Sequence, residues 1–419
     1  MAESDRALLR RLFDVALAAA RPADLLPRCL PPRPQSGRVA VVAAGKAAAS
    51  MAQALEAAWG PCDGIALTRY GHGLPLVGME LVEAAHPVPD AAGAEAAARI
   101  LALAESLGEG DTLVLLLSGG ASSLMSFGLP GVTLEAKAAL TRQLLASGAS
   151  IHEMNTLRRH LSALKGGRLA AAAFPARCLS FAISDVPGDA PETIGSGPAV
   201  PDPTTQAQAL AVLRRYGIAP EPGIAAVLTN PRLETPKPGD LRLCRAAQRL
   251  IASPQMMLEA VRDAAPLPCH LLGDAIEGEA REAGRVMAGM ARAVAAGRSG
   301  LAPPCLLVSG GETTVTLPGS AEGRGGRNVE FLMGFAEAVA GLAGITALAC
   351  DTDGIDGAAD VAGAIASGDT AERGRDAGYP LAEAMRRRDG HGFFAALGDQ
   401  IVTGPTLTNV NDFRAILIR

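Results

Sequence analysis

The feature that most constrains this 419-residue chain is a repeated alternation of short apolar runs with alanine-rich helical segments. The runs lie at residues 39–43, 112–117, 178–183, 306–308 and 345–349, and Gly, Ser or Asp follows each within a few residues. Continuous apolar runs are typical of strands buried on both faces, which is the pattern of parallel sheets. The alternation predicts an α/β fold with doubly wound sheets, in which ligands bind beyond the carboxyl ends of the strands.

A proline-rich segment interrupts this alternation. Residues 219–240 contain five prolines, and strand and helix patterns resume from about Leu241. We therefore predict two domains, residues 1–240 and residues 241–419. The similar segments LVLLLSGGASSL and CLLVSGGETTVTL leave an internal duplication open, although Ser-Gly-Gly is also a common turn after a strand.

The charge and aromatic content argue against a nucleic-acid-binding protein. Lys and Arg total 38, Asp and Glu total 43, and aromatic residues make up 3% of the chain. Phosphate backbones need clustered cations and single strands need aromatic stacking platforms, and neither is present in the sequence. We expect no nucleic-acid partner.

The first residues and the cysteines indicate the compartment. The N-terminal segment reads as an amphipathic helix with Leu9, Leu12, Phe13 and Ala16 on one face, and the strongly apolar stretch 338–350 is too short for a membrane span. The seven cysteines are scattered without a CxxC pair, which argues against a zinc site or a disulfide framework. We expect a cytoplasmic protein without a membrane partner.

Several polar segments follow the predicted strands. In VVAAGKAAASMA, Lys46 lies near a helix N-terminus, where a bound anion would explain a cation, and a solvated surface lysine is the alternative. The turn LSGGASSLM offers backbone N–H groups with Ser122 and Ser123. The segment 151–170 reads as one helix that ends at Gly166 and Gly167.

The loop at 182–205 is long, polar and rich in proline, which is typical of a functional loop, and a stiffened crossover is the alternative. In it, Asp185 or Asp189 is a candidate to bind a metal or to deprotonate a hydroxyl. The strongest local signal is GRGGRN, because its glycines allow close approach of a phosphate and Arg324 and Arg327 supply planar forks.

Two acidic or polar turns complete the pattern. Asp351, Asp353 and Asp356 cluster in DTDGIDG, where carboxylates holding magnesium near phosphates and a solvated turn are both open. The loop at 403–412 carries Thr and Asn side chains that would close a site or form a hairpin turn. The segments AAGKAAASM, LSGGASSLM, IHEMNTLRRHLSALKGGRLA, SDVPGDAPETIGSGP, SGGETTV with GRGGRN, DTDGIDG and GPTLTNVNDF occur in this order along nearly the whole chain.

Together these segments resemble the glycerate 2-kinase family, whose members are often labelled hydroxypyruvate reductases. The resemblance implies ATP-dependent phosphorylation of D-glycerate at its 2-hydroxyl, with magnesium. It also implies a Rossmann-like N-terminal domain, a smaller C-terminal α/β domain of MOFRL type, and an active site in the cleft between them. Two positions depart from the family pattern: Ala358-Ala359 replace Pro-Thr, and Leu407 replaces Gly.

The residues and the resemblance lead to one site hypothesis. Lys46 and either Arg324 or Arg327 would bind the carboxylate and the transferring phosphate. Asp189 would act as base, and Asp351 or Asp353 would position Mg²⁺. The predicted substrate- and nucleotide-binding residues are Gly45, Ser118, Gly119, Gly120, Ser122, Asn155, Gly310, Gly311, Glu312, Gly325, Gly326, Asn328, Thr408 and Asn409.

Other functions stay open from the sequence. An NAD(P)H-dependent hydroxypyruvate reductase is the first alternative, although no GxGxxG fingerprint is present in the sequence. A sugar-acid sensor that binds without turnover is the second. A homodimer is also compatible with the sequence.

Overall fold

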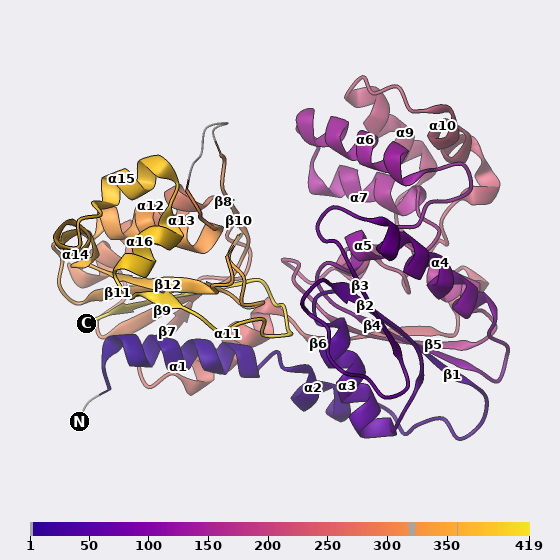
Figure 1. Cartoon of the computed structure of the whole chain (residues 1–419), viewed down its shortest axis with the longest axis horizontal. Helices are drawn as coiled ribbons and strands as arrows, with labels where there is room; N and C mark the ends of the chain where they lie inside the picture. The colour runs from indigo at the N-terminus through magenta and orange to yellow at the C-terminus, as the bar shows by residue number, and fades with distance from the viewer. Residues whose placement is uncertain (1–2, 318–322, 358) are drawn as a thin grey trace. The chain divides into compact units, whose positions relative to one another are not determined.

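The computed structural model describes residues 3–317, 323–357 and 359–419. Its contacts divide the chain into two compact units (Figure 1). Residues 22–251 form one, called here the parallel-sheet unit, and residues 1–21 with 252–419 form the other, called the mixed-sheet unit. This division differs from the predicted boundary after residue 240, because the last strand of the first sheet extends beyond that point and the first helix packs with the C-terminal part.

The parallel-sheet unit contains a six-stranded sheet in the order β3-β2-β1-β4-β5-β6. The pairings of β1 with β2 and β4, of β2 with β3 and of β4 with β5 are parallel. The apolar runs predicted this direction for β1, β4 and β5, whereas β2 and β3 were not found from the sequence. Its elements are α2 (Pro22–Cys29), β1 (Val39–Ala44), α3 (Ala48–Trp59), β2 (Asp63–Arg69), β3 (Glu80–Ala84), α4 (Ala91–Glu105), β4 (Thr112–Leu117), α5 (Ala121–Leu124), α6 (Leu134–Ala146), α7 (Ile151–His160), α8 (Arg168–Ala173), β5 (Arg177–Ile183), α9 (Gln206–Arg215), α10 (Pro222–Thr229) and β6 (Ala246–Ala252).

Two apolar cores hold this unit together. In the larger core, the strands pack against α4 and α8, with Val42, Leu115 and Ile100 fully buried. The smaller core joins α6, α7, α9 and α10, which lie together in the upper part of this unit as drawn in Figure 1. The sheet is thus a buried platform, and the loops after its strands are the places where polar side chains gather.

The mixed-sheet unit also contains a six-stranded sheet, in the order β13-β12-β11-β14-β9-β7. Its elements are α1 (Asp5–Ala18), α11 (Pro254–Ala264), β7 (Cys269–Leu271), β8 (Gly278–Glu279), α12 (Ala280–Ala295), β9 (Cys305–Ser309), β10 (Thr313–Thr314), α13 (Arg327–Ala338), β11 (Ile345–Asp351), β12 (Gly363–Ser367), α14 (Thr370–Asp376), α15 (Leu381–Arg387), α16 (Gly390–Ala396), β13 (Gln400–Ile401) and β14 (Asp412–Ile418).

The strand directions of this second sheet correct the parallel prediction. The pairings of β11 with β12 and β14, and of β14 with β9, are antiparallel, whereas β7 pairs with β9 in parallel. Helix α1 lies on one side of this sheet and α13 and α16 lie on the other (Figure 1). The antiparallel strands are therefore buried on both faces, which explains their continuous apolar runs. A continuous apolar run therefore reports burial on both faces and does not report the direction of the neighbouring strand.

The predicted N-terminal amphipathic helix is confirmed as α1. The Ser4 side chain accepts a hydrogen bond from the N–H of Ala7, which caps the helix. The four predicted apolar residues are all fully buried, and the Phe13 ring stacks on that of Phe413 in β14 with centroids 5.9 Å apart. The first helix thus covers the sheet of the C-terminal segment.

The single helix predicted over 151–170 is wrong in its extent. Helix α7 ends at His160, and the chain then leaves helical geometry because the N–H of Ala163 bonds to the carbonyl of Phe127. Gly166 and Gly167 adopt positive φ and lead into α8 rather than ending the earlier helix. This turn carries Lys165 to a buried position.

Candidate active site

The register of the parallel strands brings the ends of β1, β2 and β4 to one edge. Ala44 lies opposite both Leu67 and Leu117. The loops that follow these strands are therefore neighbours, as expected for an open α/β sheet whose ligand lies beyond the carboxyl ends. The sequence segments VVAAGK and LSGGASSL meet at this edge.

Backbone and hydroxyl hydrogen bonds fix the turn that carries Lys46. The N–H of Lys46 donates to the carbonyl of Gly119 over 2.8 Å, and the N–H of Ala47 donates to the Ser118 hydroxyl over 3.0 Å. Ser118 is fully buried, and it holds the turn two residues before α3 begins. The structure thus gives Ser118 and Gly119 internal partners, whereas Lys46 is half-buried at the sheet edge.

Gly45 is required by the close approach of this turn to the neighbouring strand. Its φ is +125°, and a Cβ there would lie 2.2 Å from the Ser118 hydroxyl oxygen and 2.5 Å from the Ser118 carbonyl oxygen. We expect Gly45→Ala to lower the unfolding free energy by at least about 2 kcal/mol in urea titrations.

Gly217→Ala is the matched control for this prediction. Gly217 has φ +64° and has nothing within 4 Å of an added Cβ, so it carries backbone strain without a clash. We expect this variant to lose only about 1 kcal/mol. Equal losses for the two variants would show that the clash with Ser118 is unimportant.

Basic side chains gather around Lys46. A Cβ on Gly120 would lie 3.0 Å from the His86 ring and 3.6 Å from the Lys46 Cγ, so both side chains lie over this glycine. His72 lies close by, with Nδ1 3.3 Å from the carbonyl oxygen of Lys46. Burial, with Arg69 and Lys46 nearby, lowers the pKa of each imidazole to about 4. The edge therefore presents a cationic, anion-attracting environment with two neutral imidazoles at pH 7.

His72 and His86 were not predicted as site residues from the sequence, because the strands that precede them were not found. The β2 sequence DGIALTR and the β3 sequence ELVEA carry charged residues and do not form the continuous apolar runs by which the other strands were found. The available signal was a histidine shortly after each of these segments.

We expect buried His72 to make stability depend on pH. Its pKa is near 6.5 when unfolded and about 4 when folded, so between these values the unfolded state binds more protons. The unfolding free energy should therefore fall as the pH is lowered from 6.5 to 4, by up to about 3 kcal/mol. Urea titrations across this range would measure the slope. His72→Gln should reduce the slope by the His72 share and leave the share of His86, whose folded pKa is also about 4. The same substitution at exposed His152 should leave the slope unchanged.

The long loop after β5 meets the loop after β4. The Ser122 and Ser196 hydroxyl oxygens lie 2.8 Å apart, and the N–H of Gly166 donates to the carbonyl of Ser196. Asp189 lies in this loop with φ +53°, and its buried Oδ1 has no hydrogen-bond partner among the described residues. The Asn155 side chain accepts from Arg158 over 3.2 Å. The role of Asp189 as base stays a prediction.

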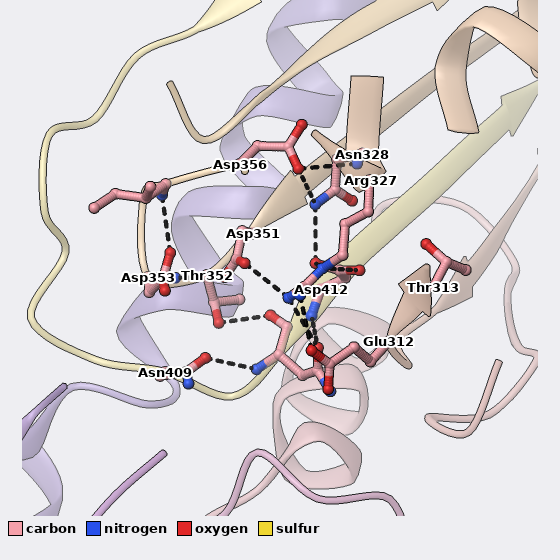
Figure 2. Close-up of polar contacts among 12 residues, drawn as sticks. Glu312, Thr313, Arg327, Asn328, Asp351, Thr352, Asp353, Asp356, Asn409 and Asp412 are labelled. Carbon is pink, nitrogen blue, oxygen red and sulfur yellow. Dashed lines mark hydrogen bonds and ion pairs between the residues drawn. The ribbon is translucent and has the colours of Figure 1, made fainter. Parts of the chain in front are cut away.

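A second polar cluster surrounds Arg327 in the mixed-sheet unit (Figure 2). The Arg327 Nε donates to Asp412, one terminal nitrogen pairs with Glu312 over 2.8 Å, and the other pairs with Asp351 over 2.8 Å. Asp412 and Asp351 are almost completely buried. The Arg327 fork is thus filled by carboxylates, and its charge joins α13 to β11, to β14 and to the loop after β9.

The glycines of GRGGRN have a structural reason in this cluster. The buried Asp356 carboxylate accepts hydrogen bonds from the N–H groups of Asn328 and Val329, both 3.0 Å, and so caps α13 from another loop. A Cβ on Gly326 would lie 2.2 Å from the Asp356 Cγ. Burial raises the pKa of Asp356 to about 7, although the two amides oppose this. The Asn328 side chain donates to Asp412 over 2.9 Å.

Arg324 differs from Arg327 in its surroundings. Its backbone is anchored, because its N–H donates to Asp389 and its carbonyl accepts from His391. Its side chain is exposed, and among residues 3–317, 323–357 and 359–419 no ion pair or hydrogen bond of its guanidinium occurs. Of the two predicted arginines, Arg324 is therefore the one whose fork is open to an anion.

The other predicted residues of this unit lie around the same loops. Gly311 has φ +103° and closely approaches Ile276, and the carbonyl of the neighbouring Gly310 accepts a hydrogen bond from Arg414.

The Thr408 hydroxyl donates to the carbonyl of Ala20, and the Asn409 side chain accepts from the N–H of Asn411. Gly325 is half-buried beside Arg324. Their ligand-binding roles stay predictions.

The positions that depart from the family pattern lie in different surroundings. Leu407 adopts a left-handed φ of +61°, where a glycine pays no penalty and a branched side chain costs about 1 kcal/mol. Ala358 lies outside the described residues, and Ala359 forms an isolated bridge with Asp356.

The predicted magnesium ligands have protein partners. Asp351 accepts from the N–H of Asp353 and pairs with Arg327, while Asp353 accepts from the N–H of Ile355. No group of three or more His, Cys, Asp or Glu side chains suited to a metal ion occurs in the described part of the chain. This donor set does not form a closed metal site, so the magnesium assignment stays a prediction.

The doubly wound sheet and the basic side chains around the Lys46 turn define an α/β protein with an anion-attracting sheet edge, and comparisons with known proteins identify its family. The chain matches the "Domain of unknown function (DUF4147)" model over residues 8–229 and the "MOFRL family" model over residues 305–412. It is 39% identical to the D-glycerate 2-kinase of Thermotoga maritima over 91% of each chain. It is 37% identical to the glycerate 2-kinase of Pyrococcus horikoshii, covering 90% of this chain and 86% of the relative.

A crystal structure of a glycerate kinase from Thermotoga maritima superimposes with a TM-score of 0.87 at 37% identity, covering 99% of each chain. A protein of Agrobacterium vitis is 51% identical over 99% of this chain and 95% of its own length, and it carries a provisional hydroxypyruvate reductase name. The chain belongs to the DUF4147 and MOFRL family of glycerate 2-kinases, which are phosphotransferase enzymes.

No helix in the described ranges is both long and apolar enough to cross a membrane.

Proposed function

We propose that this chain catalyses ATP-dependent phosphorylation of D-glycerate at its 2-hydroxyl, giving 2-phosphoglycerate and ADP. The family match supports the reaction class, because relatives along nearly the whole chain are named glycerate 2-kinases. The observation that carries the proposal is the Lys46 turn, a lysine held at the carboxyl edge of a parallel sheet by Gly119 and Ser118.

Phosphoryl transfer asks a protein mostly for positioning and charge neutralisation. In this proposal the 2-hydroxyl oxygen attacks the γ-phosphorus of ATP while the bond from that phosphorus to the β,γ-bridging oxygen breaks and ADP leaves. Lys46 supplies a point charge to the transferring phosphoryl oxygens, and Arg324 supplies a planar fork for a carboxylate or a phosphate. Asp189 takes the hydroxyl proton.

Magnesium enters the proposal as the partner ion of ATP, since this ion commonly binds substrate phosphates with one or two carboxylates. Asp351 and Asp353 are the carboxylates that would assist it. We also propose a cytoplasmic location, which the cysteines support, because all seven are unpaired.

The test is a pair of assays on the purified full chain. ADP release from ATP with D-glycerate should be rapid, whereas NADH or NADPH should not be oxidised with hydroxypyruvate. Reduced-nicotinamide oxidation without ADP release would replace the proposal with the reductase function. Binding of D-glycerate without either turnover would indicate a sensor.

A further inference from the structure

Three basic side chains gather in the parallel-sheet unit. Lys137 lies on α6, Arg158 on α7 and Lys165 on the turn that follows α7. Lys137 and Arg158 line the same small hollow between α6 and α7. Burial lowers the pKa of Lys165 and lowers that of Lys137 to about 8, and the neighbouring cations add to both shifts. Burial contributes the larger part of each shift.

The hydrogen-bond partners of this cationic cluster are neutral. The Lys137 ammonium donates to the Ser126 hydroxyl over 3.1 Å, and Arg158 donates to the Asn155 side chain over 3.2 Å. Among the described residues none of the three forms an ion pair with a carboxylate. The adjacent Arg159, in contrast, pairs with buried Asp202 over 2.9 Å.

The three cations destabilise the folded state unless a bound anion neutralises them. Lys165 is only 3% exposed, and no hydrogen bond of its ammonium occurs within the described part of the chain. A buried charge without a counter-charge destabilises the folded state, and buried ions in proteins are normally paired. Three such cations together indicate a place for a negatively charged ligand.

The cluster lies beside the loops that end two strands of the sheet. Gly166, next to Lys165, donates to the carbonyl of Ser196, whose hydroxyl meets that of Ser122. Ala163 bonds to Phe127, next to Ser126. These loops follow β5 and β4, so the cations border the edge where an open α/β sheet binds its ligand.

We infer that Lys137, Arg158 and Lys165 form an oxyanion-binding site for the carboxylate or the phosphate of a small ligand. The chemistry of the site does not depend on the proposed function. Naming the occupant as the carboxylate of glycerate or as a phosphate of ATP rests on that function, and the test separates the two sources.

The experiment is isothermal titration calorimetry of the full chain with sodium D-glycerate, inorganic phosphate and ATP. All titrations use the same ionic strength, adjusted with chloride. Lys165→Met should weaken binding of at least one of them by about ten-fold or more. It should also raise the melting temperature, because it removes an unpaired buried charge. Arg142→Met is the matched control, since this exposed arginine lies on α6, the helix that also carries Lys137.

The pattern of losses identifies the anion. Weaker glycerate binding alone indicates a carboxylate site, and weaker phosphate and ATP binding alone indicates a phosphate site. Lys137→Met gives the same test if Lys165→Met does not fold. The inference is overturned if wild-type protein binds none of the three, if both variants bind them unchanged, or if Arg142→Met loses as much. Intact anion binding with no ADP release would contradict the proposed function and leave this site standing.

Discussion

Lys46→Ala should lower turnover with D-glycerate and ATP by at least ~100-fold, because the ammonium stabilises charge that develops in the transition state. The turn that carries this lysine is fixed by backbone bonds to Gly119 and by the Ser118 hydroxyl, none of which involves the lysine side chain. The melting temperature should therefore change little. Steady-state ADP release and thermal unfolding of the same preparation would measure both.

Arg142→Met serves as the control for Lys46→Ala, because it removes one exposed positive charge from the same unit. Its turnover should equal that of the wild type. Turnover of Lys46→Ala within a few-fold of this control would refute the role of Lys46.

Arg324→Ala and Arg327→Ala should separate activity from stability. Arg327→Ala removes a cation from the carboxylates of Asp412 and Asp351, which are 0% and 4% exposed. Asp412 keeps its buried pair with Arg414. Breaking a buried ion pair in this way costs about 3–5 kcal/mol, so the variant should unfold at much lower urea concentration. The Arg324 side chain is exposed and should give little change in stability but a turnover at least ~100-fold lower.

Arg327→Lys is the companion variant for this pair. A lysine keeps the charge but cannot reach three carboxylates with a planar fork, so it should recover only part of the lost stability. The assignment is contradicted if Arg324→Ala unfolds as easily as Arg327→Ala, or if Arg327→Ala alone loses turnover while its stability is unchanged.

The sequence predicted the parts of the fold that depend on local pattern. The apolar runs located β1, β4, β5, β9 and β11, and the amphipathic face located α1. Strand direction in the second sheet was not predictable in this way, because α1 covers a face that the C-terminal segment would otherwise expose. That packing joins residues at opposite ends of the chain, such as Phe13 and Phe413.

The candidate site was predictable only to the level of motifs. Arg324 and Arg327 are equivalent in the sequence GRGGRN, and their roles separate only when Asp412, Asp351 and Glu312 are seen around one of them. Lys165 was missed because it precedes two glycines that indicated the end of a helix. Its burial arises from the turn against Phe127, which no local pattern encodes.

The regiochemistry of the product tests the central proposal most directly. Wild-type protein would be incubated with D-glycerate and ATP, and the product passed to enolase with and without a phosphoglycerate mutase. We predict that enolase alone converts the product to phosphoenolpyruvate, because 2-phosphoglycerate is its substrate. A product that reaches enolase only through the mutase, or no phosphorylated product at all, would contradict transfer to the 2-hydroxyl.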